Sequence, residues 1–186
     1  MRSREVMKRK QAMEPENVIK GRIAEALIEE LLRSSGNDVY RFGYESILQN
    51  LIQTGSHFDR RNKNAHQLRS IPDFVVLNSE GNNFFVEVKF RSSPEWLLRD
   101  LLLKQTTEYW QSKLILVTVV KPYFRIVEPQ SLTEDRCSFQ PLEADEDFHV
   151  TREALEIFEP LVERFLFNGK ANPNSFSAET PQAVRV

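Results

Sequence analysis

Three charged residues near the middle of the chain, Asp73, Glu87 and Lys89, interrupt segments that are otherwise apolar. Glu87 and Lys89 lie two positions apart in the stretch FFVEVKF (84–90), so in a strand their side chains project from the same face. Two carboxylates held close together repel unless a cation lies between them, and such oxygen ligands suit Mg²⁺, with Mn²⁺ as a substitute. A lysine beside them can orient or help deprotonate an attacking water. The set therefore indicates metal-assisted hydrolysis of a phosphodiester.

A β-hairpin is expected to position these residues. Residues 73–77 (DFVVL) and 84–90 are rich in Val and Phe, and they flank the polar turn NSEGNN. Antiparallel pairing then sets Asp73 opposite the segment from Glu87 to Lys89, with Cβ atoms of opposed residues about 5 Å apart. For Asp73 to share a face with Glu87, the loop needs an odd number of residues, or a bulge must correct the register.

The two faces of the strand over 84–90 differ in chemistry. One face is apolar and consists of Phe84, Val86, Val88 and Phe90. The other carries Phe85, Glu87 and Lys89 and is expected to open toward a ligand that needs charge. The alternative is that Glu87 and Lys89 form a solvated strand face, with Asp73 capping the turn after Pro72.

Apolar periodicity predicts the elements around the hairpin. Three- and four-residue spacing over 17–33 is typical of an amphipathic helix, which Ser34, Ser35 and Gly36 end. The other expected elements are an extended segment at 39–44, a short helix at 45–52, a long loop at 53–70, a helix at 94–110, strands at 113–120 and 123–127, and a closing helix at 150–167. Up to residue 127 the order is α, β, β, β, α, β, β, which predicts an α/β fold with a mixed central β-sheet flanked by helices.

The length of 186 residues predicts a single domain, assigned to residues 17–167. Its core is expected over 18–127, followed by an acidic C-terminal extension over 128–167. Residues 1–16 are interpreted as an N-terminal arm and residues 168–186 as a flexible tail, because both are polar.

Two short motifs resemble those of a known superfamily. IPDF (71–74) is followed, 14 residues after its Asp, by EVK (87–89). This pattern is similar to that of the PD-(D/E)xK nucleases, which share the restriction-endonuclease-like fold. GRIAE (21–25) resembles the acid-bearing helix of Holliday junction resolvases and Mrr-like restriction enzymes. The resemblance covers about residues 18–127 and implies a Mg²⁺-dependent endonuclease that acts on DNA.

The resemblance also implies a role for each matching residue. Asp73 and Glu87 would bind the metal, and the carbonyl of Val88 would add a ligand. Lys89 would serve the attacking water. Glu25 would hold water or a second metal.

Two candidates depend less on the central motif. Glu25 has Glu29 and Glu30 nearby, so an ordinary acid on the helix surface is an equal alternative. On the helix after the lysine-bearing strand the superfamily often carries Gln or Lys, for which Lys104 and Gln105 are the candidates, with Gln105 assigned to the catalytic set.

Charge is unevenly distributed along the chain. Residues 1–127 carry 20 basic and 15 acidic residues, whereas residues 128–186 carry 5 and 12. A basic part can meet the phosphates of a nucleic acid. The candidate contacts lie in the loop at 53–70 and are Arg60, Arg61, Lys63 and Arg69. A solvated loop is at least as good an interpretation of the same four residues.

Several other classes of protein are disfavoured. The single cysteine, Cys137, cannot form an internal disulfide, and the three histidines lack the spacing of a zinc site. A phosphate-binding loop of the G-x-x-x-x-G-K-[ST] type is missing from the sequence, which argues against nucleotide triphosphate hydrolysis. The longest apolar run, 114–120, is far shorter than the roughly 20 residues of a membrane helix. We therefore expect a cytoplasmic protein with no membrane partner.

The sequence leaves alternatives to a DNA endonuclease open. One is a catalytically inactive module of the same fold that binds nucleic acid or a protein partner. Another is an enzyme that acts on RNA, because nothing in the sequence reads the 2′-hydroxyl. Cutting both DNA strands would favour a homodimer, for which the acidic C-terminal third offers a surface.

Overall fold

The computed structural model describes residues 15–42, 70–94, 100–132 and 137–167. The predicted short helix at 45–52 and nearly all of the predicted loop at 53–70 lie outside these ranges. So do residues 1–14 of the predicted arm and the predicted tail.

Six strands form one mixed sheet in the order β1-β2-β3-β4-β5-β6. They are β1 (Asp38–Arg41), β2 (Phe74–Leu77), β3 (Asn83–Arg91), β4 (Lys113–Thr118), β5 (Phe124–Val127) and β6 (Gln140–Pro141). All neighbouring strands are antiparallel except β3 and β4, which are parallel. The α/β class with a mixed sheet is therefore confirmed, whereas the short edge strand β6 was not predicted.

A crossover connects the parallel pair, because parallel neighbours cannot be joined by a tight turn. It contains the helix α4 (Asp100–Leu103), which continues directly into the π-helix η1 (Lys104–Tyr109). The sequence predicted one regular helix over 94–110. Residues 95–99 lie outside the described ranges, and the described helical part changes its hydrogen bonding at Lys104. In this part the hydroxyls of Thr106 and Thr107 donate to helix carbonyls.

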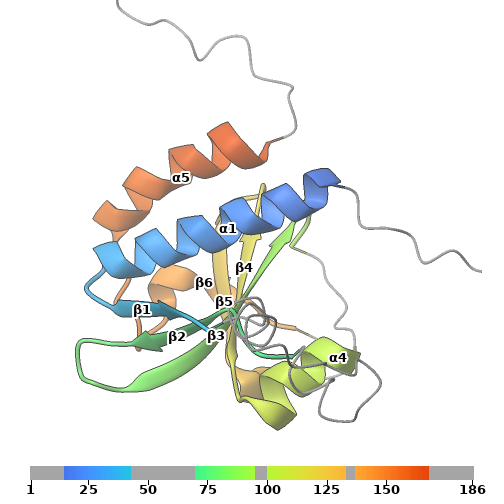
Figure 1. The fold of residues 1–186 in the computed structure, drawn as a ribbon. Coiled ribbons are helices and arrows are strands. Elements are labelled where there is room, and N and C mark those ends of the chain that lie inside the picture. The colour runs from blue at the N-terminus through green and yellow to red at the C-terminus, as the bar shows by residue number, and fades with distance from the viewer. Residues whose placement is uncertain (1–14, 43–69, 95–99, 133–136, 168–186) are drawn as a thin grey trace, which may run out of the picture.

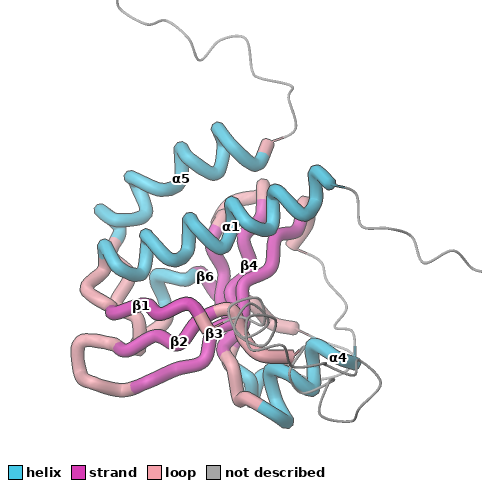
Figure 2. Tube along the Cα trace, viewed as in Figure 1, coloured by secondary structure: helices cyan, strands magenta, loops and turns pink. Residues whose placement is uncertain are grey.

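Two long helices lie side by side on one face of the sheet (Figures 1 and 2). They are α1 (Pro15–Ser34) and α5 (Arg152–Leu166). α1 begins two residues before the predicted start, with Pro15 in its first turn, where the missing N–H costs nothing. α5 is capped by Thr151, whose hydroxyl accepts from the Ala154 N–H at 3.2 Å.

The main core lies between these helices and the sheet. The buried side chains of α1 and α5 join those of β2 to β5 in a single cluster, which includes Leu31, Val88, Ile115 and Phe158. The closing helix therefore completes the same core as the segment 18–127. Burial of its apolar residues contributes about 25 cal/mol per Å² of apolar surface removed from water.

The opposite face of the sheet carries a smaller core under α4 and η1. It consists of Leu102, Leu114, Val127 and Leu132. Glu87 is aligned with Leu114 in the pairing of β3 and β4, so it projects from this second face. The sequence predicted an open face here. The structure corrects this, because the crossover covers Glu87 and leaves it only 4% exposed.

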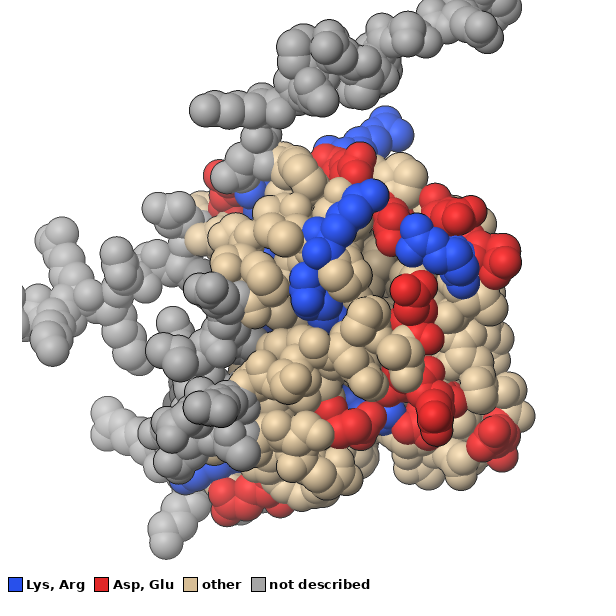
Figure 3. Space-filling model, turned by 180° about the vertical axis from the view of Figure 1, so that it is seen from behind, with Lys and Arg blue, Asp and Glu red and all other residues tan. Residues whose placement is uncertain are grey.

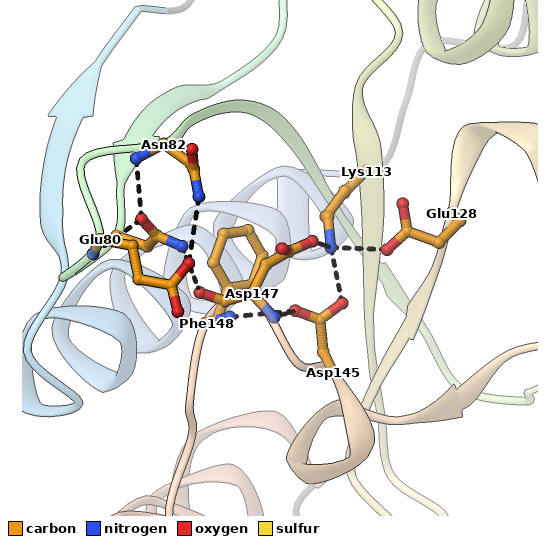
Figure 4. A network of polar contacts seen from close by, with 8 residues as sticks. Glu80, Asn82, Lys113, Glu128, Asp145, Asp147 and Phe148 are labelled. Atoms are coloured by element: carbon orange, nitrogen blue, oxygen red, sulfur yellow. Dashed lines mark hydrogen bonds and ion pairs between the residues drawn. The ribbon is translucent and has the colours of Figure 1, made fainter.

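A buried lysine ties the segment after β6 to the sheet. Lys113, at the start of β4, forms ion pairs with Asp145 at 2.8 Å, Asp147 at 2.5 Å and Glu128 at 2.5 Å (Figure 4). Its ammonium also lies 5.0 Å from the ring centroid of Phe148.

Within the described ranges, no helix has the length and apolarity needed to cross a bilayer.

Candidate active site

The register of the hairpin places Asp73 directly across from Glu87. Phe74 pairs with Val86 and Leu77 with Asn83, so the residue before Phe74 falls opposite the residue after Val86. The loop at 78–82 holds an odd number of residues, as required for the two carboxylates to share a face. The predicted loop parity is therefore confirmed, and Asp73 immediately precedes the first paired residue of β2.

A hydrogen bond fixes the Asp73 carboxylate against β3. Its Oδ2 atom accepts from the backbone N–H of Val88 at 2.8 Å. This donor belongs to the residue between Glu87 and Lys89, so Asp73 is held at the centre of the EVK motif. The alternative, in which Asp73 only caps the turn after Pro72, does not account for this contact across the hairpin.

Glu87 is a buried carboxylate with two side-chain donors. The Lys89 ammonium bonds to Oε1 and the Gln105 amide bonds to Oε2. Burial raises the pKa of Glu87 to about 7, and the negative charge of Asp73 adds to this, while Lys89 and Gln105 act in the opposite direction. A buried acid facing a second acid is the electrostatic arrangement that a bound cation relieves.

Lys89 connects Glu87 with the backbone of its own strand. Its ammonium also donates to the Val88 carbonyl at 3.2 Å, and the side chain remains 31% exposed. Burial alone would lower the pKa of Lys89, but the charges of Glu87 and Asp73 outweigh it and raise the pKa above its ordinary value. Lys89 is therefore a charged donor at the solvent side of the carboxylate pair.

Glu25 approaches the site from α1. Burial and the charge of Asp73 raise its pKa, whereas Arg22, Lys89 and Arg41 lower it. Glu25 also forms a 3.6 Å ion pair with Arg22. These couplings place Glu25 within electrostatic range of Asp73 and Lys89, so it is more than an acid on a remote helix surface.

The structure distinguishes the two candidate residues on the crossover, Lys104 and Gln105. Gln105 is buried and donates to Glu87, whereas Lys104 is exposed. The sequence could not separate them because they are adjacent. In a helix one residue advances the side chain by about 100°, so Lys104 and Gln105 point in different directions.

Asp73 and Glu87 suit a divalent metal ion. Both offer carboxylate oxygens on one face, and the carbonyl of Val88 lies within reach of the same ammonium as Glu87. Among the described residues, three acidic oxygens meet within 4.8 Å of one another only at Glu128, Asp145 and Asp147. Glu25 therefore does not complete such a triad with Asp73 and Glu87, and water would supply the remaining ligands.

The acidic group at Glu128, Asp145 and Asp147 differs from this pair. Figure 4 shows the Lys113 ammonium among its carboxylates, where it already supplies the positive charge. Within the described part of the chain, the pair Asp73 and Glu87 has only the Lys89 ammonium beside it, so it is better suited to a cation than this group.

Some predicted residues lie elsewhere or outside the described ranges. Arg60, Arg61, Lys63 and Arg69 all fall within residues 43–69, as do His57 and His66. Trp110, which follows the π-helix, packs edge-on against Phe42 and Phe85, with ring centroids 5.6 and 5.3 Å away. The sequence analysis did not identify Arg41, whose positive charge lowers the pKa of Glu25. Its only signal in the sequence is a charge at the end of a short extended segment.

Comparisons with known proteins do not assign the chain to a family. No protein-family model matches the sequence, and no curated protein matches it either.

Gln105 gives a first prediction. We expect Gln105→Ala to weaken Mn²⁺ binding or activity by about 10- to 100-fold, because the loss of a group that orients a metal ligand typically has this effect. Isothermal titration calorimetry with Mn²⁺ measures it. Gln140→Ala is the matched control, since Gln140 is exposed on the edge strand β6, three strands from β3 in the sheet. Equal affinities in the two variants would contradict a positioning role for Gln105.

Proposed function

We propose that the chain is a Mg²⁺-dependent endonuclease of the PD-(D/E)xK type that hydrolyses phosphodiester bonds in DNA. The single observation that carries the proposal is the placement of Asp73 opposite Glu87, with Lys89 on the same strand face. The element order α1-β1-β2-β3-α4-β4-β5 supports a restriction-endonuclease-like fold.

Each residue has a definite task in this proposal. Asp73, Glu87 and the Val88 carbonyl hold Mg²⁺, which when bound supplies Lewis-acid stabilisation of the charge on the phosphate. Lys89 donates a hydrogen bond that holds the attacking water, or it neutralises charge that develops on the phosphate oxygens. The buried amide of Gln105 orients Glu87.

Glu25 has a separate task on the water side of the site. Its coupling to Asp73 and Lys89 suits a group that holds water or a second metal ion. Because its pKa is raised by burial, Glu25 can also accept a proton from a water near Lys89.

Metal removal is the direct test of the proposed function. Purified protein is incubated with supercoiled plasmid, linear duplex and branched DNA in Mg²⁺, in Mn²⁺ or in EDTA. We expect cleavage in both metals and none in the chelator, since the two carboxylates lose their function without a cation between them.

The addition of an RNA substrate, together with calorimetry of Mn²⁺ binding, separates the competing interpretations. Mn²⁺ binding without cleavage of any DNA, and cleavage of RNA instead, would redirect the proposal to an RNA substrate. The absence of both Mn²⁺ binding and cleavage would overturn catalysis and favour the inactive module that binds nucleic acid or protein.

A further inference from the structure

The face of the sheet that carries Glu87 and Lys89 continues onto β4 and β5. Lys89 is aligned with Leu116 on β4, and Leu116 is aligned with Arg125 on β5. Aligned residues of neighbouring strands share a face, so Lys89 and Arg125 project from the same side of the sheet. Adjacent strands are about 4.8 Å apart, which puts the two backbones about 10 Å from each other.

Arg91 extends this set of cations along β3. It lies two residues after Lys89, so it shares the same face, and it is aligned with Thr118 at the end of β4. The end of β3, where the parallel pair finishes, therefore carries three cations: Lys89, Arg91 and Arg125.

Arg125 differs from several other arginines of the structure. Arg33, Arg41 and Arg152 form ion pairs with glutamates. Within the described ranges, the guanidinium of Arg125 instead donates a 3.0 Å hydrogen bond from Nη2 to the Lys121 carbonyl, a neutral acceptor. Its positive charge is therefore anchored but not neutralised by that contact.

One donor of Arg125 also lacks a partner. Its Nε–H is buried and makes no hydrogen bond within the part of the chain that the structure describes. A phosphate could reach the guanidinium at its exposed Nη2 end, since the hydrogen bond to the Lys121 carbonyl lies at the surface. Figure 3 shows the face of the molecule seen from behind, where a strip of Lys and Arg side chains lies beside neutral surface and is bordered by Asp and Glu.

We propose that Arg125 and Arg91 each bind a DNA backbone phosphate beside the one that lies at Lys89. The inference rests on the proposed function, and it adds the direction of the bound strand, which crosses from β3 over β4 to β5. Arginine suits this role because its planar guanidinium can donate two parallel hydrogen bonds to one phosphate. These contacts position the DNA and do not read its sequence.

DNA binding at several salt concentrations tests the proposal. Fluorescence anisotropy of a short labelled duplex is measured in EDTA, which keeps the DNA intact, for the wild type and for Arg125→Gln. We expect the slope of log affinity against log salt to fall by about 1 for each phosphate contact removed. Between 50 and 200 mM salt the wild type should therefore lose about threefold more affinity than the variant.

Matched variants make the result specific. Arg125→Gln combined with Arg91→Gln should lower the slope by about 2. Arg164→Gln removes an exposed arginine from α5, on the other face of the sheet, and should leave the slope unchanged. Circular dichroism confirms that each variant keeps its helices and strands.

Two outcomes overturn the inference. One is an unchanged affinity and slope in Arg125→Gln, and the other is an absence of salt-dependent DNA binding by the wild type. A failure of the proposed function gives a different result, namely no DNA cleavage in either Mg²⁺ or Mn²⁺. If Arg125→Gln weakens binding but the wild type never cuts, the phosphate contact stands and only the catalysis is overturned.

Discussion

Replacement of Lys89 by Met is expected to reduce DNA cleavage by about 10²- to 10⁴-fold while the protein still binds Mn²⁺. Methionine keeps the approximate length and apolar stem of lysine but removes the ammonium that contacts Glu87 and the Val88 carbonyl. The two carboxylates remain in place, so the metal still has its ligands. A plasmid-nicking assay gives the rate, and calorimetry gives the affinity for Mn²⁺.

The carboxylates should behave differently from the lysine. Asp73→Asn and Glu87→Gln each remove one negative ligand with almost no change of shape, and we expect both to lose cleavage together with most of the Mn²⁺ affinity. Neither amide should unfold the protein. Burial is the main cause of the raised pKa of Glu87 and repulsion by Asp73 adds to it, so Glu87→Gln removes a buried charge and either amide removes the repulsion.

The control for this series is Arg164→Gln, which changes a charge on α5 and should cut DNA at the wild-type rate. Wild-type cleavage by all three site variants would rule out the proposed catalytic set. Cleavage lost in Asp73→Asn and Glu87→Gln but kept in Lys89→Met would retain the metal pair and remove Lys89 from the mechanism.

The hairpin could be predicted because its information is local. Strand periodicity fixed which residues share a face with Glu87, and loop parity linked that face to Asp73. The observed register, with Phe74 opposite Val86, meets this requirement without a bulge. The identity of the donor that holds Asp73, the Val88 amide, follows from the same register.

The covering of Glu87 could not be predicted in the same way. Alternation along β3 indicated that Glu87 faces away from the main core, but it carries no information about what packs on the second face. That depends on the path of the crossover, and on a π-helix in which Gln105 rather than Lys104 turns toward the sheet. Both are tertiary effects that adjacent residues in a sequence do not reveal.

The long-range contacts of the C-terminal segment were also outside the reach of sequence patterns. An acidic composition suggested a surface, yet Asp145 and Asp147 lie around a lysine from β4, more than 30 positions away. Likewise, the Asn37 amide donates to the Phe148 carbonyl at 2.9 Å, which joins the end of α1 to the same segment. Pairings of this kind depend on the finished fold.

Loss of the ion pairs between Lys113 and its three acidic partners is expected to have the largest effect on stability. We expect Lys113→Met to lower the free energy of unfolding by about 3 to 5 kcal/mol, because breaking a buried ion pair leaves an uncompensated charge in a poorly solvated place. Lys113 and Asp145 have side chains only 3% and 2% exposed, so water cannot easily replace the lost ammonium. Urea unfolding followed by circular dichroism measures the change.

Lys121→Met is the matched control, since Lys121 is exposed and its nearest acid, Glu159, is 3.8 Å away. Removing that surface pair should cost at most about 1 kcal/mol. The free energy of unfolding of a domain is only about 5 to 15 kcal/mol, so Lys113→Met could fail to fold at all.

Asp147→Asn then provides a milder test, because Asp147 is 39% exposed and Lys113 keeps two other acids. The expected order of stability is wild type, Asp147→Asn and then Lys113→Met. If both variants unfold at the wild-type urea concentration, the Lys113 cluster contributes nothing to the attachment of the C-terminal segment, and the apolar contacts of α5 alone hold it in place.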